Sequence, residues 1–226
     1  FEIKRGIATG ANEFFIVDLE RAGKYNLPAK FLTPILPSPR YLNSDEVLAG
    51  VNGEPLLKRR LFLIDCDLPE EQVARHYPTL WRYLQLGVEQ GVHNGYLCRH
   101  RNPWYAQDMR APSPFLCTYM GRTTNGHTDS PFRFILNHSL AVAPNVYLNI
   151  YPNRLLASSL AERPEWKRTV WRALQTVPVE ELTGEGRVYG GGLYKLEPKE
   201  LGNLPISEIV DWNELLSAIP HQEALF

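Results

Sequence analysis

Long apolar runs are missing from this chain of 226 residues. No stretch of about 18 consecutive apolar residues occurs, which argues against a membrane-spanning helix, and residues 1–5 lack the apolar core of a signal peptide. We therefore expect a cytoplasmic protein without a membrane partner. Because the sequence begins without methionine, we also expect it to be a piece of a longer protein.

Cysteine is scarce, and its three positions do not form a metal or disulfide pattern. Cys66, Cys98 and Cys117 are odd in number, have no C-x-x-C spacing and lie far from any histidine pair, which favours reduced core thiols. The nearest approach to a ligand pair is His127 with Asp129, in a turn-rich segment. We expect no metal site.

Familiar catalytic motifs are absent too. The chain has no G-x-S-x-G elbow, no P-loop and no H-E-x-x-H motif. Asp65 and Asp67 follow a predicted strand but lack the E-x-K of a PD-(D/E)xK nuclease, and acids in that position commonly cap the next turn or helix. We therefore assign no catalytic residues to this chain.

Residues 102–105, Asn-Pro-Trp-Tyr, resemble the Asn/Asp-Pro-Pro-Tyr/Phe loop of adenine and cytosine amino-methyltransferases, with the second proline replaced. That reaction needs S-adenosylmethionine, and the F-x-G-x-G turn that binds it is missing. The glycine-rich residues 189–195 lie in an acidic region that would repel phosphate, so we interpret them as a bend or a close backbone approach. A damaged active site is disfavoured.

Charge is unevenly distributed along the chain. Residues 176–226 hold nine acidic and three basic residues, a net charge of −6, which leaves +5 for residues 1–175 because the whole chain carries −1. Between residues 95 and 135 there are five arginines and no lysine. Arginine without lysine favours geometric recognition of phosphates or planar groups. A solvated arginine-bearing face is the alternative.

The pattern of apolar residues predicts an α+β fold. Residues rich in β-branched and aromatic side chains predict five strands, at 12–18, 60–66, 115–120, 132–137 and 145–151. Four-residue spacing predicts amphipathic helices at 78–90 and 164–174, the latter with Pro164 in its first turn, and the last forty residues indicate short helices joined by prolines. We expect one loop-rich domain with a mixed β-sheet and peripheral helices, divisible into residues 1–175 and an acidic part, 176–226.

Aromatic and arginine residues interleave between Tyr96 and Arg122, followed by the polar loop 123–127. Arginine can donate two hydrogen bonds to guanine, asparagine can pair with adenine, and aromatic rings can stack on bases or wedge between them. These residue types therefore fit a surface that reads DNA. The alternative is that Trp104, Phe115 and Tyr119 belong to the core and that the arginines are solvated.

Several segments, taken in order, resemble the C-terminal half of adenine-specific DNA methyltransferases of restriction–modification systems. They are KRGIATGANEFFIV (4–17), FLTPILPSPRYL (31–42), PWY (103–105), PFLCTYMGR (114–122), FRFILNHSLAVAPNVYLNIYP (132–152) and GRVYGGGLYKLEPKELGNLP (186–205). The resemblance spans nearly the whole chain. It implies a target-recognition domain that grips double-stranded DNA while a separate catalytic domain methylates a flipped adenine.

The same resemblance implies that the catalytic domain, with the true Asn-Pro-Pro-Tyr loop and the S-adenosylmethionine site, lies upstream in the same polypeptide. Residues 102–105 then belong to a recognition element. We expect no cofactor in this chain itself. The resemblance identifies neither the recognised sequence nor the residues that read it.

The candidate DNA contacts come from residue chemistry, and each has a structural alternative. Arg5, Thr9 and Asn12 lie in a glycine-flanked turn, where they suit phosphate positioning, an approach to the flipped nucleotide or simply hydrogen bonds that hold the turn. The full set is Arg5, Thr9, Asn12, Lys58, Arg59, Arg60, Arg99, Arg101, Trp104, Tyr105, Arg122, Thr124, Asn125, Arg187 and Tyr189.

Two other functions remain open at this point. One is a protein-interaction module whose acidic C-terminal region docks another subunit, which binding insensitive to salt would reveal. The other is a nuclease or methyltransferase that acts on its own, or a nuclease-associated domain of a fused restriction enzyme, which activity assays with metal or S-adenosylmethionine would reveal.

Overall fold

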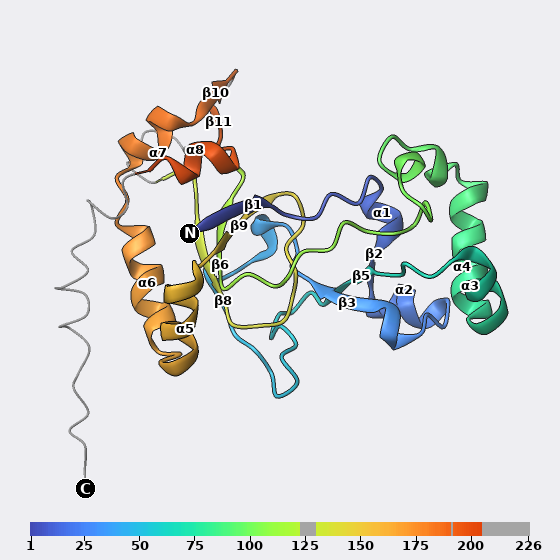
Figure 1. Ribbon diagram of the computed structural model, residues 1–226. Coiled ribbons are helices and arrows are strands. Elements are labelled where there is room, and N and C mark those ends of the chain that lie inside the picture. The colour runs from blue at the N-terminus through green and yellow to red at the C-terminus, as the bar shows by residue number, and fades with distance from the viewer. Residues whose placement is uncertain (123–129, 191, 205–226) are drawn as a thin grey trace, which may run out of the picture.

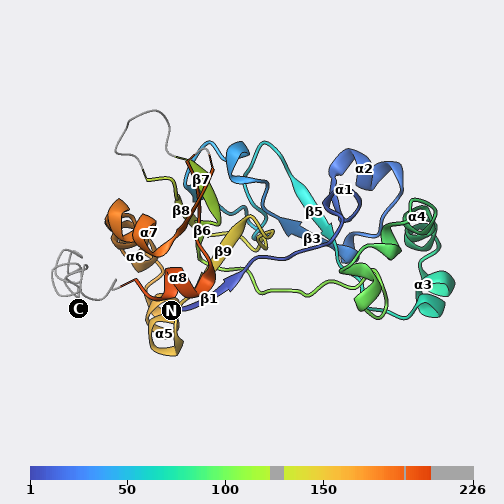
Figure 2. The ribbon, with the colours of Figure 1, turned by 90° about the horizontal axis from the view of Figure 1, so that it is seen from above.

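The computed structural model describes residues 1–122, 130–190 and 192–204 of the chain. It is an elongated molecule with two lobes (Figure 1). The sheet lobe contains a five-stranded sheet and helices α5, α6, α7 and α8. The helical lobe, at the other end, contains a three-stranded sheet and helices α1 to α4. Seen from above, the lobes again lie at opposite ends, with several chain segments between them (Figure 2).

The helices and strands have the following bounds in chain order, with η for 3-10 helices. They are β1 (Glu2–Arg5), α1 (Asn12–Phe15), β2 (Ile16–Asp18), α2 (Leu19–Lys24), η1 (Ala29–Phe31), β3 (Leu32–Ile35), η2 (Pro39–Tyr41), β4 (Glu46–Val47), β5 (Leu61–Ile64), α3 (Glu70–His76), α4 (Pro78–Glu89), η3 (Val92–Asn94), η4 (Cys98–His100), β6 (Phe115–Thr118), β7 (Met120–Arg122), β8 (Phe134–Asn137), β9 (Tyr147–Tyr151), α5 (Arg154–Glu162), α6 (Trp166–Gln175), α7 (Val179–Glu185), β10 (Arg187–Tyr189), β11 (Leu193–Lys195) and α8 (Pro198–Gly202).

The five-stranded sheet has the order β1-β9-β6-β8-β4 and is mixed, because β4 pairs with β8 in parallel and the other pairs are antiparallel. Side chains alternate between its two faces. Phe115 and Cys117 of β6 pack into a core that the helices α5 to α8 cover, whereas Leu116 between them packs into a second core on the opposite face. Strand β6 is therefore buried on both faces.

The helical lobe has its own core around the sheet β2-β5-β3. Helix α4 contributes Leu80, Tyr83 and Leu84 to this core, which explains its four-residue apolar spacing. The hydroxyl of Tyr83 donates to the carbonyl oxygen of Phe14 over 2.7 Å, so its polar end is satisfied inside the lobe.

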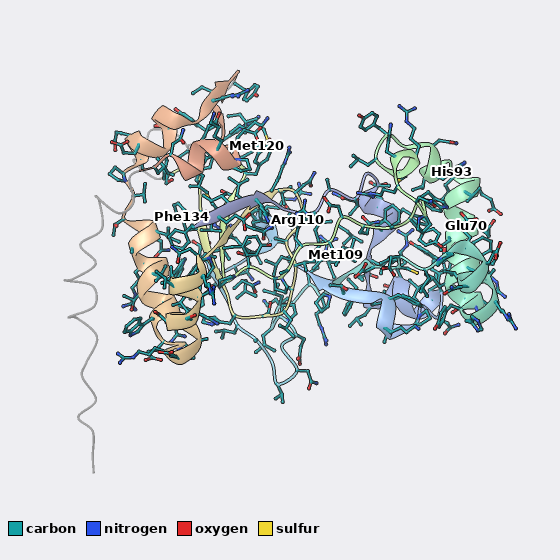
Figure 3. All side chains as sticks on the ribbon, viewed as in Figure 1. Glu70, His93, Met109, Arg110, Met120 and Phe134 are labelled. Atoms are coloured by element: carbon teal, nitrogen blue, oxygen red, sulfur yellow. The ribbon has the colours of Figure 1, made fainter. Side chains whose placement is uncertain are left out.

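Buried backbone contacts join the two lobes. Ile7 donates through its N–H to the carbonyl oxygen of Ala143, and Asn145 donates to the carbonyl oxygen of Ile7. At Gly6 a Cβ atom would lie 2.2 Å from the carbonyl oxygen of Pro144, so this crossing requires glycine. Residues 106–114 form another crossing, on which Figure 3 labels Met109 and Arg110.

The α+β class and the mixed sheet are confirmed, as are four of the five predicted strands and both predicted helices, although Pro164 precedes α6 instead of lying in its first turn. The prediction of a strand over 12–18 is wrong in its first half, where residues 12–15 form helix α1. Phe14 and Phe15 are both buried in one core, and Ala11 accepts from both of their N–H groups. A strand would have pointed these neighbouring rings to opposite faces.

The C-terminal part also differs from the prediction. Strands β10 and β11 pair antiparallel, and Gly192 just before β11 has a φ of 68°, which fits the expected bend. The sequence predicted short helices joined by prolines for this region and did not predict the two strands. The three cysteines are free and buried, as predicted. None of the helices in the described ranges is long and apolar enough to cross a membrane.

Candidate functional site

The turn at residues 6–12 connects the two lobes and is held by an arginine far along the chain. Arg101 donates to the carbonyl oxygen of Ala8 over 2.6 Å and to that of Thr9 over 2.9 Å. It also donates to the side chain of Gln107 over 3.3 Å. This candidate DNA contact is half-buried, and its guanidinium is turned towards the protein backbone. The structure therefore gives Arg101 a structural role.

The same turn packs directly against the chain around η4. Gly10 has a φ of 83°, and a Cβ atom there would lie 3.0 Å from the Cβ of Leu97. The hydroxyl of Thr9 donates to the side-chain oxygen of Asn12 over 2.6 Å and accepts from the N–H of Ala11. Thr9 is buried, so it holds the turn, whereas Asn12 is exposed. The structural alternative holds for Thr9, and Asn12 remains accessible.

A cleft of about 630 Å³ opens beside this turn. Backbone and side chains of the turn form one wall, residues 90–97 form another, and Asn145 reaches it from the loop before β9. The lining residues are Ala8, Gly10, Ala11, Asn12, Glu13, Phe14, Arg21, Gln90, Val92, Leu97 and Asn145.

Near the cleft, the segment containing η3 and η4 presents an exposed aromatic residue with two basic neighbours. Tyr96 is 69% exposed, its ring centroid lies 4.6 Å from that of His100, and the guanidinium of Arg99 lies 5.3 Å from the Tyr96 ring. Arg99 is exposed and has no acidic partner among the described residues. This group can contact an anionic or planar ligand.

On the sheet lobe, a second basic and aromatic cluster surrounds Tyr119. The guanidinium of Arg5 lies 4.0 Å from the Tyr119 ring and the ammonium of Lys195 lies 5.3 Å from it. The Tyr119 hydroxyl donates to Glu197 over 2.7 Å. Burial opposes ionisation of Glu197, but hydrogen bonds from Lys195 and Tyr119 outweigh it and lower the pKa of this carboxyl from 4.5. Glu197 thus fixes Lys195, while Arg5 has no acidic hydrogen-bond partner among the described residues.

The hairpin β10–β11 extends this cluster. It pairs with β7, which places Arg122 opposite Leu193, and it carries exposed Tyr189 within 5.9 Å of the Lys195 ammonium. Arg187 is exposed but forms an ion pair of 3.1 Å with Glu200. In Figure 1, β10 and β11 rise on one side of β1, and residues 92–100 rise on the other.

Lys58, Arg59 and Arg60 are exposed, but they lie with a different group of residues. The guanidinium of Arg59 lies 4.6 Å from the ring of Tyr41, and that of Arg40 lies 4.8 Å from the same ring. Neither arginine has an ion pair in the described part of the chain. We call Arg40, Tyr41, Lys58 and Arg59 the η2 patch. Arg40 and Tyr41 were missed as candidates, although an arginine next to a tyrosine in a proline-rich turn was a usable signal.

Tyr105 cannot contact DNA in this structure, because it is fully buried and donates to the carbonyl oxygen of Leu68. Burial also raises the pKa of its hydroxyl. Trp104 is half-buried, with ring contacts to Phe14 and Phe15 in the same core. Tyr105 is thus a core residue, and Trp104 packs against the same core while part of its surface stays exposed.

The arginine and aromatic residues of 95–135 therefore do not form one continuous surface. Phe115 and Tyr119 are buried in the sheet lobe, and Tyr105 in the helical lobe. Thr124 and Asn125 lie outside the described residues. Among the residues that are described, no three histidine, cysteine, aspartate or glutamate side chains gather as a metal site would require.

A family model described as "Type II methyltransferase M.Eco57I, C-terminal domain" matches residues 1–223. The Type II methyltransferase M.XamI of Xanthomonas campestris pv. amaranthicola is 30% identical over 217 residues, which cover 92% of this chain and 35% of the relative. The Type II methyltransferase M.AccI of Acinetobacter calcoaceticus is 26% identical over 203 residues, 88% of this chain and 34% of the relative. The chain thus spans about a third of the length of these relatives.

Proposed function

The chain belongs to the family of the C-terminal domain of Type II methyltransferase M.Eco57I, and from this premise we propose that it is the DNA target-recognition domain of a restriction–modification methyltransferase. The bound DNA is double-stranded and its modified base is adenine. Adenine specificity rests on the resemblance of residues 4–17, 31–42, 114–122 and 132–152 to adenine-specific DNA methyltransferases.

One observation carries the proposal. Arg5 and Arg99 are two exposed arginines that form no ion pair among the described residues, and each lies against a tyrosine ring. They flank the turn at residues 6–12, and Glu197, the carboxylate near Arg5, is bonded to Lys195 and Tyr119. A ring beneath a guanidinium restricts its position and leaves its five N–H donors free for a phosphate. A duplex that lies over β1 would meet Arg5 and Tyr189 on the sheet lobe and Arg99 and Tyr96 on the helical lobe.

The two kinds of contact have different effects. Arginine contacts to phosphates supply affinity and fix the position of the protein on the duplex, but they carry little sequence information. Sequence is read by side chains that reach base edges, for which Asn12 and Arg122 are exposed candidates. Arg187 ranks below Arg5 and Arg99, because Glu200 already neutralises it.

We assign the transfer reaction to a separate domain of the same polypeptide. That domain would bind S-adenosylmethionine and receive the flipped adenine, and the whole protein would act in the cytoplasm. The length of the relatives supports this division, since this chain covers only 35% and 34% of them. No residue of this chain is assigned a catalytic role.

The test is binding of the chain to a fluorescent DNA duplex at low salt, measured by anisotropy for the wild type and for Arg5→Ala/Arg99→Ala. Loss of two phosphate contacts should weaken binding and flatten the slope of log K against log salt by about two units. The matched control is Arg75→Ala/Arg82→Ala, which removes two exposed arginines from α3 and α4 at the far end of the helical lobe and should leave the slope unchanged.

Equal slopes for the two double variants would contradict the proposed surface. Binding that does not fall with salt in the wild type would contradict DNA recognition itself and favour a protein-docking module.

A further inference from the structure

We propose that the cleft beside residues 8–13 accepts an unpaired nucleobase that has left the DNA stack. The inference rests on the proposed function, since it assumes a DNA ligand, but it concerns a site and a ligand that phosphate contacts alone do not require. Four properties of the cleft support it: its size, its free backbone donor, its unpartnered amides and its balanced charge.

The backbone donor follows from the Arg101 clamp. A trans peptide points its C=O and its N–H in opposite directions, so the N–H of Gly10 points away from the arginine that binds the Thr9 carbonyl oxygen. Gly10 lines the cleft and Arg101 does not. No acceptor for the Gly10 N–H exists among the described residues. In our proposal this donor is available to a ligand in the cleft.

Three side-chain amides line the same space. Gln90 and Asn145 have no side-chain hydrogen bond to the described residues, and the amide NH₂ of Asn12 has none either, because Asn12 uses only its oxygen, as the acceptor for Thr9. An amide offers an adjacent donor and acceptor, the arrangement that pairs with base edges. Phe14, Val92 and Leu97 add an apolar wall for a ring.

The charge of the lining favours a base over a bare phosphate. Glu13 and Arg21 are the only two ionisable side chains among the residues that line the cleft, and their charges cancel. Arg21 also donates to the carbonyl oxygen of Glu13 over 2.6 Å. Arg5 and Arg99, which form no ion pair among the described residues, lie outside the cleft, where the phosphates on either side of an extruded nucleotide would lie.

The volume fits as well, since 630 Å³ lies within the range of about 300 to 1,000 Å³ typical of small-molecule sites. A base inside a duplex is stacked and cannot enter a cleft, so only a base outside the stack can occupy this one. The partner that an extruded adenine leaves unpaired becomes such a base when it also leaves the stack, and a free nucleotide has the same chemistry.

Two duplexes that differ at one position test the inference. One carries 2-aminopurine as an unpaired bulge and the other carries it paired with thymine. Because the bulge avoids an unpairing cost of a few kcal/mol, the chain should bind the bulged duplex at least about tenfold more tightly, and the 2-aminopurine emission should change on binding.

The diagnostic variant is Gln90→Leu/Asn145→Leu, which removes two cleft amides and should abolish the preference for the bulge without changing affinity for the paired duplex. Its matched control is Gln72→Leu/Asn94→Leu, in which both amides are exposed and lie outside the cleft. Thermal unfolding of each variant shows whether the fold is retained.

Equal affinity of the wild type for both duplexes would overturn the inference and leave the proposed function standing. Failure to bind either duplex would overturn both. If the 2-aminopurine emission changes when the chain is added to the free deoxynucleotide but not when it is added to the bulged duplex, the cleft binds a free nucleotide. That result would overturn its role in DNA binding.

Discussion

The guanidinium of Arg101 donates a 2.6 Å hydrogen bond to the carbonyl oxygen of Ala8, 93 positions earlier in the chain. An arginine that the sequence alone places among DNA contacts thus holds the turn that connects the two lobes. Its neighbour Arg99 is exposed and remains available to a ligand. Arg101 therefore supports the fold, whereas Arg99, two positions earlier, is free to bind a ligand. Single substitutions at the two positions can distinguish these roles.

We expect Arg101→Ala to lower the free energy of unfolding by about 2 kcal/mol, because it leaves the carbonyl oxygens of Ala8 and Thr9 without their charged donor. Urea denaturation measures this change. Arg99→Ala should stay within about 0.5 kcal/mol of the wild type, as an exposed substitution usually does. Equal losses in both variants would show that Arg101 does not hold the turn.

Gly6→Ala should destabilise the protein by about 2 kcal/mol or more, since the added Cβ would lie 2.2 Å from a backbone oxygen of Pro144 and the backbone must move. Gly23→Ala is the matched control. Nothing lies within 4 Å of a Cβ at Gly23 in helix α2, so alanine should stabilise by about 0.5 kcal/mol. Thermal denaturation compares the stability of the two variants. A Gly6→Ala variant as stable as the wild type would contradict the close approach of Gly6 to the Pro144 backbone.

Glu197 should stabilise the fold in a pH-dependent way. Its pKa is lowered in the folded state, so its contribution is complete above the unfolded pKa of 4.5 and is lost as the pH falls through the lower, folded value. The stability difference between wild type and Glu197→Gln should therefore be largest near neutral pH and shrink in acid. Chemical denaturation at several pH values tests this. Exposed Glu89→Gln on α4 is the control, and a pH-independent difference would refute the prediction.

The η2 patch should contribute a separate set of phosphate contacts. Arg40→Ala/Arg59→Ala removes two guanidinium groups that share the Tyr41 ring and lack acidic partners among the described residues. We expect weaker duplex binding and a salt slope flatter by about two units. Fluorescence anisotropy measures both, with Arg75→Ala/Arg82→Ala as the control. An unchanged slope would mean that DNA does not reach this patch.

All three cysteines should react slowly with a thiol reagent in the native chain. Each is buried, and burial raises the pKa of Cys66, Cys98 and Cys117, so little reactive thiolate forms. Addition of denaturant should expose three fast-reacting thiols, counted by absorbance. A thiol that reacts fast before denaturation would show an opening that the structure lacks.

The sequence predicted the central strands because β6, β8 and β9 are dense in apolar and β-branched residues. It failed at residues 12–15, where the same kind of composition forms a helical turn. The difference depends on tertiary packing, since Phe14 and Phe15 both enter one core and Tyr83 bonds to the Phe14 carbonyl oxygen. Strands β10 and β11 were missed because three residues are too few to show an alternating pattern.

For the candidate site, residue type was informative and position was not. Composition indicates arginine and tyrosine as candidates, but it cannot distinguish Arg99, which faces solvent, from Arg101, which binds backbone oxygens. The sequence also left open whether Phe115 lies in the core or on the surface. A central strand buried on both faces shows no alternation of polar and apolar residues that would have decided this. The cleft was not predicted, since its walls come from residues 8–14, 90–97 and 145, which only folding brings together.

The crossing at β3 limits how far the molecule can bend. Ile35 at the end of β3 is buried in the core of the helical lobe, and Leu36, the next residue, is buried in a core of the sheet lobe. A hinge at this point would expose both side chains to water, at a cost of about 1.5 to 3 kcal/mol each. The distance between Arg5 on the sheet lobe and Arg99 on the helical lobe is therefore set before any ligand arrives, and in the proposed complex a double helix that does not match it would itself have to deform.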